Sequence, residues 1–293
     1  MPPAIASAPP HPTLPPFATI PSLTKLIDFV ERHRRLFVLT GAGCSTESGI
    51  PDYRDSDGQW KHKKPVQFQD FVHGEPMRQR YWARSLLGWQ HFSQARPNSA
   101  HRALARLEAA GFVHQLVTQN VDGLHQQAGS RRVLDLHGRL DWVECLSCHV
   151  RGARTAFQQT LEALNPDFLQ HSAASAPDGD ALLETVDFNR FRIPGCPNCG
   201  GILKPGVVFF GESVPRPRVD RAYARLAEAD ALLVVGSSLM VYSGFRFCRA
   251  ASEQNKPQAA VNMGRTRADD CFAHKITAPC GATLTALADQ LGV

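Results

Sequence analysis

Short apolar runs alternate along the chain with amphipathic segments. The runs typical of buried strands cover residues 36–39, 115–118, 207–210, 231–235 and 258–262, and the clearest helical segments cover residues 23–33, 101–110 and 219–229. Apolar strands connected by helices are typical of a mostly parallel sheet that is covered on both faces. The pattern therefore predicts an α/β fold with a doubly wound parallel sheet, whose ligands bind beyond the carboxyl ends of the strands.

The pattern changes between residues 141 and 203, where two Cys-x-x-Cys pairs flank a polar stretch. The pairs are Cys145 with Cys148 and Cys196 with Cys199. Four thiolates in two chelating pairs are typical of a tetrahedral zinc ribbon, and such a filled shell leaves no open position for chemistry. We therefore predict one structural zinc ion in a small module over residues 141–203, inserted into a sheet domain formed by residues 23–140 and 204–293.

Composition narrows the class of protein. The 293 residues are 43% hydrophobic, which is enough for a sizeable core. The net charge is +5, but positive and negative residues are mixed along the sequence, so nucleic-acid binding is not implied. The sequence contains no run of about 18 apolar residues, which a membrane span would need, and no secretory signal is recognisable. Residues 1–22 contain eight prolines, which predicts a disordered tail. The expected location is the cytoplasm.

The longest motif runs from Thr40 to Arg54 and reads TGAGCSTESGIPDYR, directly after the first apolar run. Its glycines allow backbone N–H groups to approach a phosphate. Thr46 stands where the G-x-G-x-x-G motif of hydride-transferring enzymes has its third glycine. The motif therefore favours NAD as ligand without dehydrogenase chemistry. A plain tight turn is the alternative for residues 41–43 alone, but it does not account for residues 50–54.

Polar residues also end three later apolar segments. Residues 119–122, Gln-Asn-Val-Asp, could bind ribose hydroxyls and a carboxamide, although Asn-x-Asp-Gly is also an ordinary turn signal. Residues 234–238 and 261–264 end in small or amide side chains that could receive adenosine, and each is a weak signal by itself. His137, directly before Gly138, can accept a proton at neutral pH.

In this order, from about Leu23 to the C-terminus, these stretches resemble the sirtuins. The resemblance implies a Rossmann-like domain, a small zinc domain and a cleft between them, where NAD as co-substrate meets an acyl-lysine protein or peptide. The implied activity is NAD-dependent protein-lysine deacetylation or deacylation, in which the acyl group passes from lysine to ADP-ribose and nicotinamide is released. Protein ADP-ribosyl transfer and lipoamidase activity are alternatives on the same fold. A binding module without catalysis is disfavoured by His137 and Asn120.

The resemblance also implies roles for individual residues. His137 would be the general base, and Asn120 would assist catalysis at the nicotinamide. Contacts to NAD are expected from Gly41, Ala42, Gly43, Ser45, Thr46, Asp52, Tyr53, Arg54, Gln119, Asn120, Val121, Asp122, Gly236, Ser237, Ser238, Asn262, Met263, Gly264 and Cys280. Contacts to the substrate are expected from Tyr81, Arg84, Val207, Phe209, Phe210 and Gly211. The segment 204–212 would pair with the substrate backbone as an extra strand.

Within the sirtuins, the class II branch, which includes the mitochondrial sirtuin 4, is the most similar. Residues 78–84, Gly88-Trp89 and residues 177–180 carry this resemblance. Tyr81 and Arg84 have the Tyr-x-x-Arg spacing that reads an acidic acyl group in related sirtuins. The alternative is a helix whose arginine faces solvent or an NAD phosphate. The sequence leaves the acyl group, the target proteins and the oligomeric state open.

Overall fold

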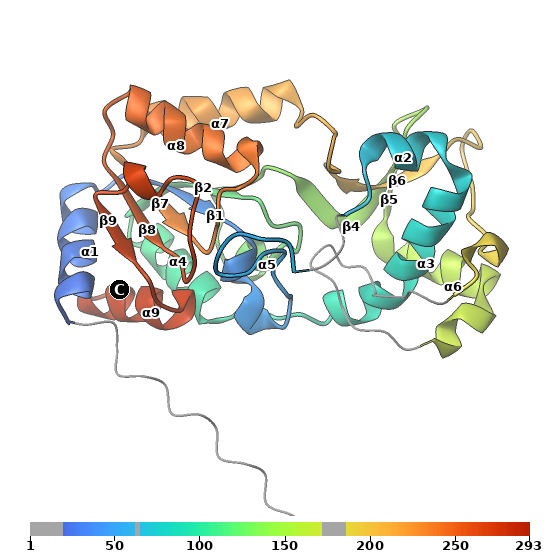
Figure 1. The fold of residues 1–293 in the computed structure, drawn as a ribbon, viewed down its shortest axis with the longest axis horizontal. Helices are drawn as coiled ribbons and strands as arrows, with labels where there is room; N and C mark the ends of the chain where they lie inside the picture. The colour runs from blue at the N-terminus through green and yellow to red at the C-terminus, as the bar shows by residue number, and fades with distance from the viewer. Residues whose placement is uncertain (1–19, 62–64, 172–185) are drawn as a thin grey trace, which may run out of the picture.

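The computed structural model describes residues 20–61, 65–171 and 186–293. Most of the expected N-terminal tail, and residues 177–180, lie outside this part of the chain. The largest feature is a six-stranded parallel sheet with the order β3-β2-β1-β7-β8-β9 (Figure 1). Its strands are β1 (Leu36–Thr40), β2 (Val113–Thr118), β3 (Val133–Asp135), β7 (Ala231–Val235), β8 (Gln258–Val261) and β9 (His274–Ile276).

Helices cover both faces of this sheet. The face covered by α1 (Ile20–Arg32), α4 (Ser99–Ala109) and α9 (Cys280–Gln290) buries Val38 and Leu233. The opposite face, covered by α7 (Arg216–Glu228) and α8 (Tyr242–Glu253), buries Phe37 and Phe247. Successive residues of β1 thus point to opposite cores, which is why this strand is an unbroken apolar run. The doubly wound α/β fold predicted from the sequence is confirmed.

The strand order reverses between β1 and β7. β1 pairs with β2 on one side and with β7 on the other, all three parallel, so the sheet has the strand order of a dinucleotide-binding fold. In such sheets the connections after the two central strands leave in opposite directions and open a crevice at the carboxyl ends. The glycine-rich loop that follows Thr40 begins at this position.

A second, smaller sheet lies beside the first and has the order β5-β4-β6, with antiparallel pairing (Figure 1). Its strands are β4 (Gly138–Cys145), β5 (Arg151–Ala153) and β6 (Leu203–Val207). Around it lie α2 (Phe68–His73), α3 (Glu75–Phe92), α6 (Arg154–Leu164) and two short 3-10 helices (Pro166–Gln170 and Phe188–Arg190). Trp82, Leu161 and Phe191 are buried in their common core.

This core has consequences for the expected domain division. α2 and α3 pack with the small sheet although they lie within residues 23–140, which the sequence assigned to the sheet domain. β4 and β6 also cross the expected limits of the module at 141 and 203. The motif spacing located the four cysteines, whereas long-range packing decides which core each helix joins. The boundaries themselves stay a prediction.

One predicted strand was wrong. Residues 207–210 were expected in the parallel sheet, but the strand there is β6, which ends at Val207 in the small antiparallel sheet. Beyond it, the Val208 N–H donates to the His137 carbonyl at 2.7 Å. A short apolar run indicates burial and does not say in which sheet. Among the described residues, no helix has both the length and the apolar character needed to cross a bilayer.

Candidate active site

The glycine-rich loop begins where β1 ends, at the reversal of strand order. It forms two 3-10 turns, Ala42–Cys44 and Thr46–Ser48, and its Gly43 N–H donates to the Gly236 carbonyl at 2.9 Å. Gly236 has φ +59°, and a Cβ atom there would lie 2.3 Å from the Cys44 nitrogen. The loops after β1 and β7 can therefore approach this closely only because glycine occupies the contact.

A cavity of about 1080 Å³ extends from this loop to the region of β6. Every residue that the sequence suggested for NAD contact lines it, as do His137 and five of the six residues suggested for substrate contact. Those five are Tyr81, Val207, Phe209, Phe210 and Gly211. Arg84 is not among the lining residues. The cavity volume is slightly above the usual range of about 300–1,000 Å³ for small-molecule sites, which suits a ligand as long as a dinucleotide.

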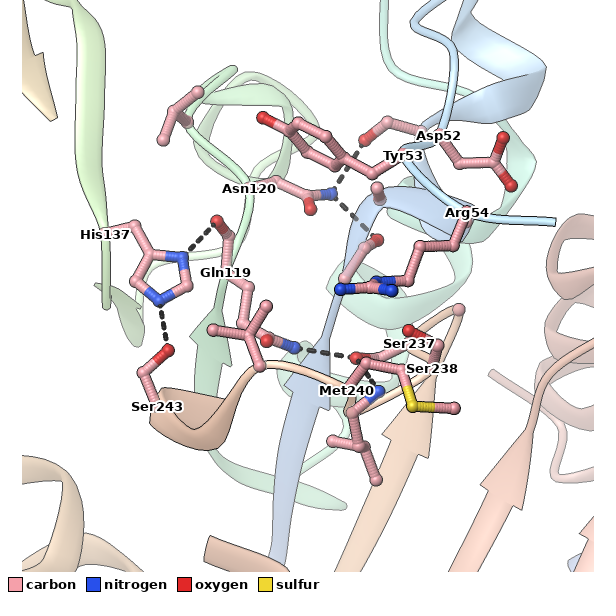
Figure 2. Close-up of a pocket in the computed structure, with 18 of the residues that line it drawn as sticks. Asp52, Tyr53, Arg54, Gln119, Asn120, His137, Ser237, Ser238, Met240 and Ser243 are labelled. Carbon is pink, nitrogen blue, oxygen red and sulfur yellow. Dashed lines mark hydrogen bonds between the residues drawn. The ribbon is translucent and has the colours of Figure 1, made fainter. Parts of the chain in front are cut away.

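His137 is held on both ring nitrogens (Figure 2). Nδ1 lies 2.9 Å from the Gln119 carbonyl, and since a carbonyl oxygen can only accept, Nδ1 carries the proton. Nε2 is then the acceptor in the neutral ring and lies 2.7 Å from the Ser243 hydroxyl. The pKa of His137 is lowered to about 4, mainly by burial, with the hydrogen bond to the Gln119 carbonyl opposing the shift and the charges of Arg218 and Arg246 adding to it. The imidazole is therefore neutral at pH 7 and ready to accept a proton.

Asn120 and Asp122 follow β2 and are fixed by the glycine-rich loop. The Asn120 amide donates to the Gly41 carbonyl and to the Ser45 hydroxyl, both at 3.0 Å. The Ser45 hydroxyl in turn donates to Asp122 at 2.7 Å. Burial raises the pKa of Asp122, although hydrogen bonds from the Leu124 N–H and Ser45 oppose the shift. The result is a preorganised group of amide and carboxyl side chains on the cavity wall.

Gln119 connects the two central strands at the cavity floor. Its side-chain amide donates to the Ser237 hydroxyl at 2.8 Å and to the Thr40 carbonyl at 3.2 Å. Its backbone carbonyl is the partner of His137. Gln119 thus links the loop after β7 to His137, and this link brings residues that are distant in sequence to the same wall of the cavity (Figure 2).

Arg54 supplies positive charge at the glycine-rich end of the cavity. Its guanidinium donates to the Gly58 carbonyl at 2.7 Å and stacks 4.0 Å above the Trp60 ring. Burial lowers the pKa of Arg54, which at pH 7 remains charged. Tyr53 packs edge-on against Trp60 and Phe210. A fixed cation and backbone N–H groups at one end suit the pyrophosphate of NAD.

Residues after β8 and at the start of α9 also line the cavity, next to the segment that follows β1. The Asn262 amide donates to the Gly264 carbonyl at 2.9 Å, and Met263 is 59% exposed. Cys280 is buried, and burial raises the pKa of its thiol to about 12. A neutral thiol and a neutral amide suit an uncharged ligand group such as adenosine.

The four cysteines of the small module lie together, as their spacing predicted. Their sulfur atoms are all within 4.8 Å of one another, with Cys145 and Cys199 at 3.5 Å and Cys148 and Cys196 at 3.7 Å. Four thiolates around zinc at about 2.3 Å would be about 3.8 Å apart. The donor set therefore fits a structural zinc ion.

Among the lining residues that sequence reasoning missed, one group comes from the connection after β7 and the start of α8. They are Leu239, Met240, Val241, Tyr242, Ser243 and Arg246. Ser243 is the most informative, because it contacts His137 across 106 positions of sequence. A Ser-Gly pair at the start of a helix carries no local signal of such a role. Only the placement of α8 beside the central strands reveals it.

Comparison with known proteins agrees with this geometry. The model of the Sir2 family matches residues 41–243. The chain is similar to an NAD-dependent protein deacetylase of Bordetella bronchiseptica, with 63% identity over 262 residues that cover 89% of this chain and 96% of that protein. A Pseudomonas syringae pv. tomato protein named NAD-dependent protein deacetylase 3 is 49% identical over 91% of this chain and 96% of its own.

Solved structures give the same result. One described as "Structural Basis for the Mechanism and Regulation of Sir2 Enzymes" is 32% identical with a TM-score of 0.73, and the match covers 93% of this chain and 98% of that one. Another, described as "Sir2-p53 peptide-NAD+", is 27% identical with a TM-score of 0.72, and covers 92% and 98%. The chain belongs to the Sir2 family.

Proposed function

We propose that this chain is an NAD-dependent protein-lysine deacylase with His137 as its general base. The observation that carries the proposal is a single cavity lined by the glycine-rich loop, by His137 and by the segment that follows β6. Similar proteins are named NAD-dependent protein deacetylases. A structural relative is described with peptide and NAD together, which supports the same pair of substrates here.

Different residues of the cavity bind different parts of NAD. Arg54 and the N–H groups of the glycine-rich loop hold the pyrophosphate, and residues 262–264 with Cys280 receive adenosine. Asn120 and Asp122 face the nicotinamide carboxamide, where one supplies an amide and the other a carboxyl group whose pKa is raised by burial. Gln119 orients the nicotinamide ribose, because its side chain is itself fixed by Ser237.

The acyl-lysine peptide enters beside β6. This strand is at the edge of the small sheet, and after it Phe210 forms only an isolated parallel bridge to Gln67. Such an edge can accept an extended backbone as an added strand. The acyl-lysine side chain then reaches into the cavity past Phe209, and this path leads toward His137.

In the reaction, the acyl oxygen attacks C1′ of the nicotinamide ribose. The C1′–N bond breaks, and nicotinamide leaves with the electron pair of that bond, so that an alkylimidate remains on ADP-ribose. His137 Nε2 then takes the proton of a ribose hydroxyl, whose oxygen attacks the imidate carbon. Addition of one water and loss of the amine give free lysine and acylated ADP-ribose. Enclosing both reactants in one cavity supplies the proximity this sequence needs.

The test is a quantitative assay of His137→Ala with NAD and an acetyl-lysine peptide. We expect deacylation to fall by about 10²–10⁴-fold, the usual contribution of a general base. The matched control is His73→Ala, an exposed histidine at the end of α2, outside the cavity. Deacylation at the wild-type rate in His137→Ala would remove the proposed base.

The alternative reaction on the same fold, ADP-ribosyl transfer to a protein side chain, differs in its products. Deacylation releases one nicotinamide for each lysine freed, whereas transfer releases nicotinamide without loss of the acyl group. Measuring both products in one reaction separates the two activities. Nicotinamide release without freed lysine would replace the deacylase by a transferase.

The assignment to the class II, sirtuin-4-like branch is a narrower proposal. It is supported by residues 78–84 on α3, although Arg78 also joins α3 to α2 by donating to the Phe71 and Val72 carbonyls at 3.0 and 2.8 Å. Tyr81 lines the cavity, and Arg84 does not. Tyr81 packs against Phe209, and the cavity lining also contains the apolar Ile50 and Phe92, which favours an uncharged acyl chain over an acidic one.

A panel of acetyl, lipoyl, succinyl, glutaryl and hydroxymethylglutaryl peptides tests this preference. If Arg84 reads a carboxylate, Arg84→Ala will impair acidic acyl substrates more than acetyl. Equal losses on acidic acyl and acetyl substrates in Arg84→Ala would reject this role of Arg84. A cytoplasmic location, also expected from the sequence, stays a prediction.

A further inference from the structure

Ser243 contacts the base nitrogen of His137 from the first turn of α8 (Figure 2). Because Nδ1 donates to the Gln119 carbonyl, Nε2 has only its lone pair to offer, and the Ser243 hydroxyl must be the donor in the 2.7 Å contact. The imidazole is thus held between a fixed acceptor and a fixed donor. Both His137 and Ser243 line the cavity.

The Ser243 hydroxyl does not cap the start of α8. The helix begins after Val241, whose side chain makes no capping hydrogen bond, and the Gly244 and Phe245 N–H groups donate to the Val241 carbonyl instead. α8 is anchored in the core by Phe247, which is fully buried. The position of Ser243 is therefore set by packing elsewhere in the helix, and its hydroxyl is available to His137.

The two partners of the imidazole are also connected to each other. Gly244, next to Ser243, packs against the Gln119 side chain so closely that a Cβ atom would lie 2.4 Å from Oε1. Gln119 holds Nδ1 through its backbone carbonyl. The spacing between this carbonyl and the Ser243 hydroxyl, which determines how the ring is oriented, thus depends on the contact of α8 with Gln119.

We propose that Ser243 is a positioning residue for the deacylation step, which with the Gln119 carbonyl fixes the tautomer and orientation of His137. The inference rests on the proposed role of His137 as base. The Nε2 lone pair accepts one strong hydrogen bond at a time, so the serine hydrogen turns aside when the ribose hydroxyl donates. Once the proton has moved, the same Ser243 oxygen accepts a hydrogen bond from Nε2–H and stabilises the imidazolium.

The reaction order provides a readout that a merely structural role would not give. Nicotinamide leaves before His137 acts, so exchange of labelled nicotinamide into NAD, in the presence of acetyl-lysine peptide, does not depend on the base. In Ser243→Ala we expect kcat for deacylation to fall on the order of tenfold, less than after removal of the base itself. Nicotinamide exchange and the KM for NAD should stay at their wild-type values.

Three further variants complete the experiment. Ser243→Thr keeps a hydroxyl and should restore deacylation, and Ser93→Ala, at the exposed end of α3, is the matched control. In the double variant His137→Ala with Ser243→Ala, the second change should have no further effect, because Ser243 acts only through His137.

The outcomes separate the two proposals. Wild-type deacylation in His137→Ala overturns the base and, with it, the role of Ser243. An impaired His137→Ala beside a fully active Ser243→Ala overturns the inference alone. So does a Ser243→Ala that loses exchange and deacylation equally, or a double variant in which the two losses add.

Discussion

In the part of the chain that the structure describes, two groups of cysteine and histidine side chains lie close enough to share a metal ion. One consists of Cys145, Cys148, Cys196 and Cys199 in the small module, and the other of Cys44, His101 and His125 beneath the glycine-rich loop. In each group the ligand atoms lie within 4.8 Å of one another. Their surroundings differ, and the difference shows what proximity alone does not decide.

The sulfur atoms of the first group lie against one another, and Cys145 also accepts a hydrogen bond from the Ser147 N–H. Cys199 is exposed and Cys148 half-buried, so a metal ion can reach them from solvent. The second group is sealed in the core, with exposed fractions of 0–1%. There one ring nitrogen of each histidine has a close partner, as His125 Nε2 lies 2.9 Å from the Thr40 hydroxyl and His101 Nδ1 2.9 Å from Asn98 Oδ1, while His125 Nδ1 has none among the described residues.

Burial separates the two groups further. It raises the pKa of the Cys44 thiol well above its ordinary value, which disfavours the thiolate that zinc binds. The buried group therefore stabilises the protein by packing and hydrogen bonding. It joins β1, α4 and the start of α5 (Leu124–Gln127) beneath the loop. The cysteine pairs instead depend on an ion to hold them.

Loss of the zinc ion should have the largest effect. Structural zinc contributes about 10–16 kcal/mol in zinc-finger peptides, far more than a small three-stranded sheet can replace. Chelation, or Cys145→Ser, should therefore unfold the small module. The parallel sheet and the helices that cover it should stay folded, so that these helices keep their helical signal. Tryptophan fluorescence reports this event, because Trp82 and Trp89 of α3 pack in the core shared with the small sheet, Trp142 lies on β4, and the fourth tryptophan, Trp60, lines the cavity.

Metal analysis of the same proteins tests the comparison itself. We expect one zinc ion per chain, lost in Cys145→Ser and retained in Cys44→Ser. A second ion that disappears in Cys44→Ser would show that the buried group also binds metal.

A smaller effect is expected at Gly236, where the backbones of the loops after β1 and β7 approach each other closely. In Gly236→Ala, the new Cβ atom would collide with the Cys44 nitrogen, and φ +59° is strained for alanine. Together these should cost about 2–4 kcal/mol of unfolding free energy, measured by urea titration, and weaken NAD binding. Gly111→Ala is the control, since φ is +87° there and nothing lies within 4 Å, so strain of about 1–2 kcal/mol is its only cost.

Equal losses in the two glycine variants would mean that the loop has room to move away from β7. NAD binding as tight in Gly236→Ala as in the wild type would show that the contact does not shape the site.

The features predicted from sequence were those with a local signal. The apolar run of β1 followed by glycines placed the loop at the carboxyl edge, and parallel strands then bring Gln119 and Ser237 to the same edge. The spacing of the cysteines predicted their cluster. Tyr81 and Arg84 show the limit of such reasoning, because their spacing gives no indication of which side chain faces the cavity. Packing of α3 on the small sheet decides this, just as packing of α8 decides the position of Ser243.

The smallest predicted effect concerns acid stability of the buried group. Burial lowers the pKa of His101 to about 4, from 6.5 when unfolded, and nearby Arg102 contributes. The unfolded chain therefore takes up a proton that the folded chain refuses. Stability from this group is fully present above pH 6.5 and is lost as the pH falls toward 4, by at most about 3 kcal/mol.

In His101→Gln this loss should be absent, so that the unfolding free energy falls less steeply between pH 6.5 and 4 than in the wild type. Urea titrations across this range measure the difference. Protonation of the zinc thiolates weakens both proteins alike and cancels in the comparison, and His73→Gln, an exposed site, should keep the wild-type slope. Identical slopes in His101→Gln and the wild type would mean that His101 is protonated in the folded core. The buried group would then carry a charge, as the zinc cysteines do, and the distinction between the two regions would no longer hold.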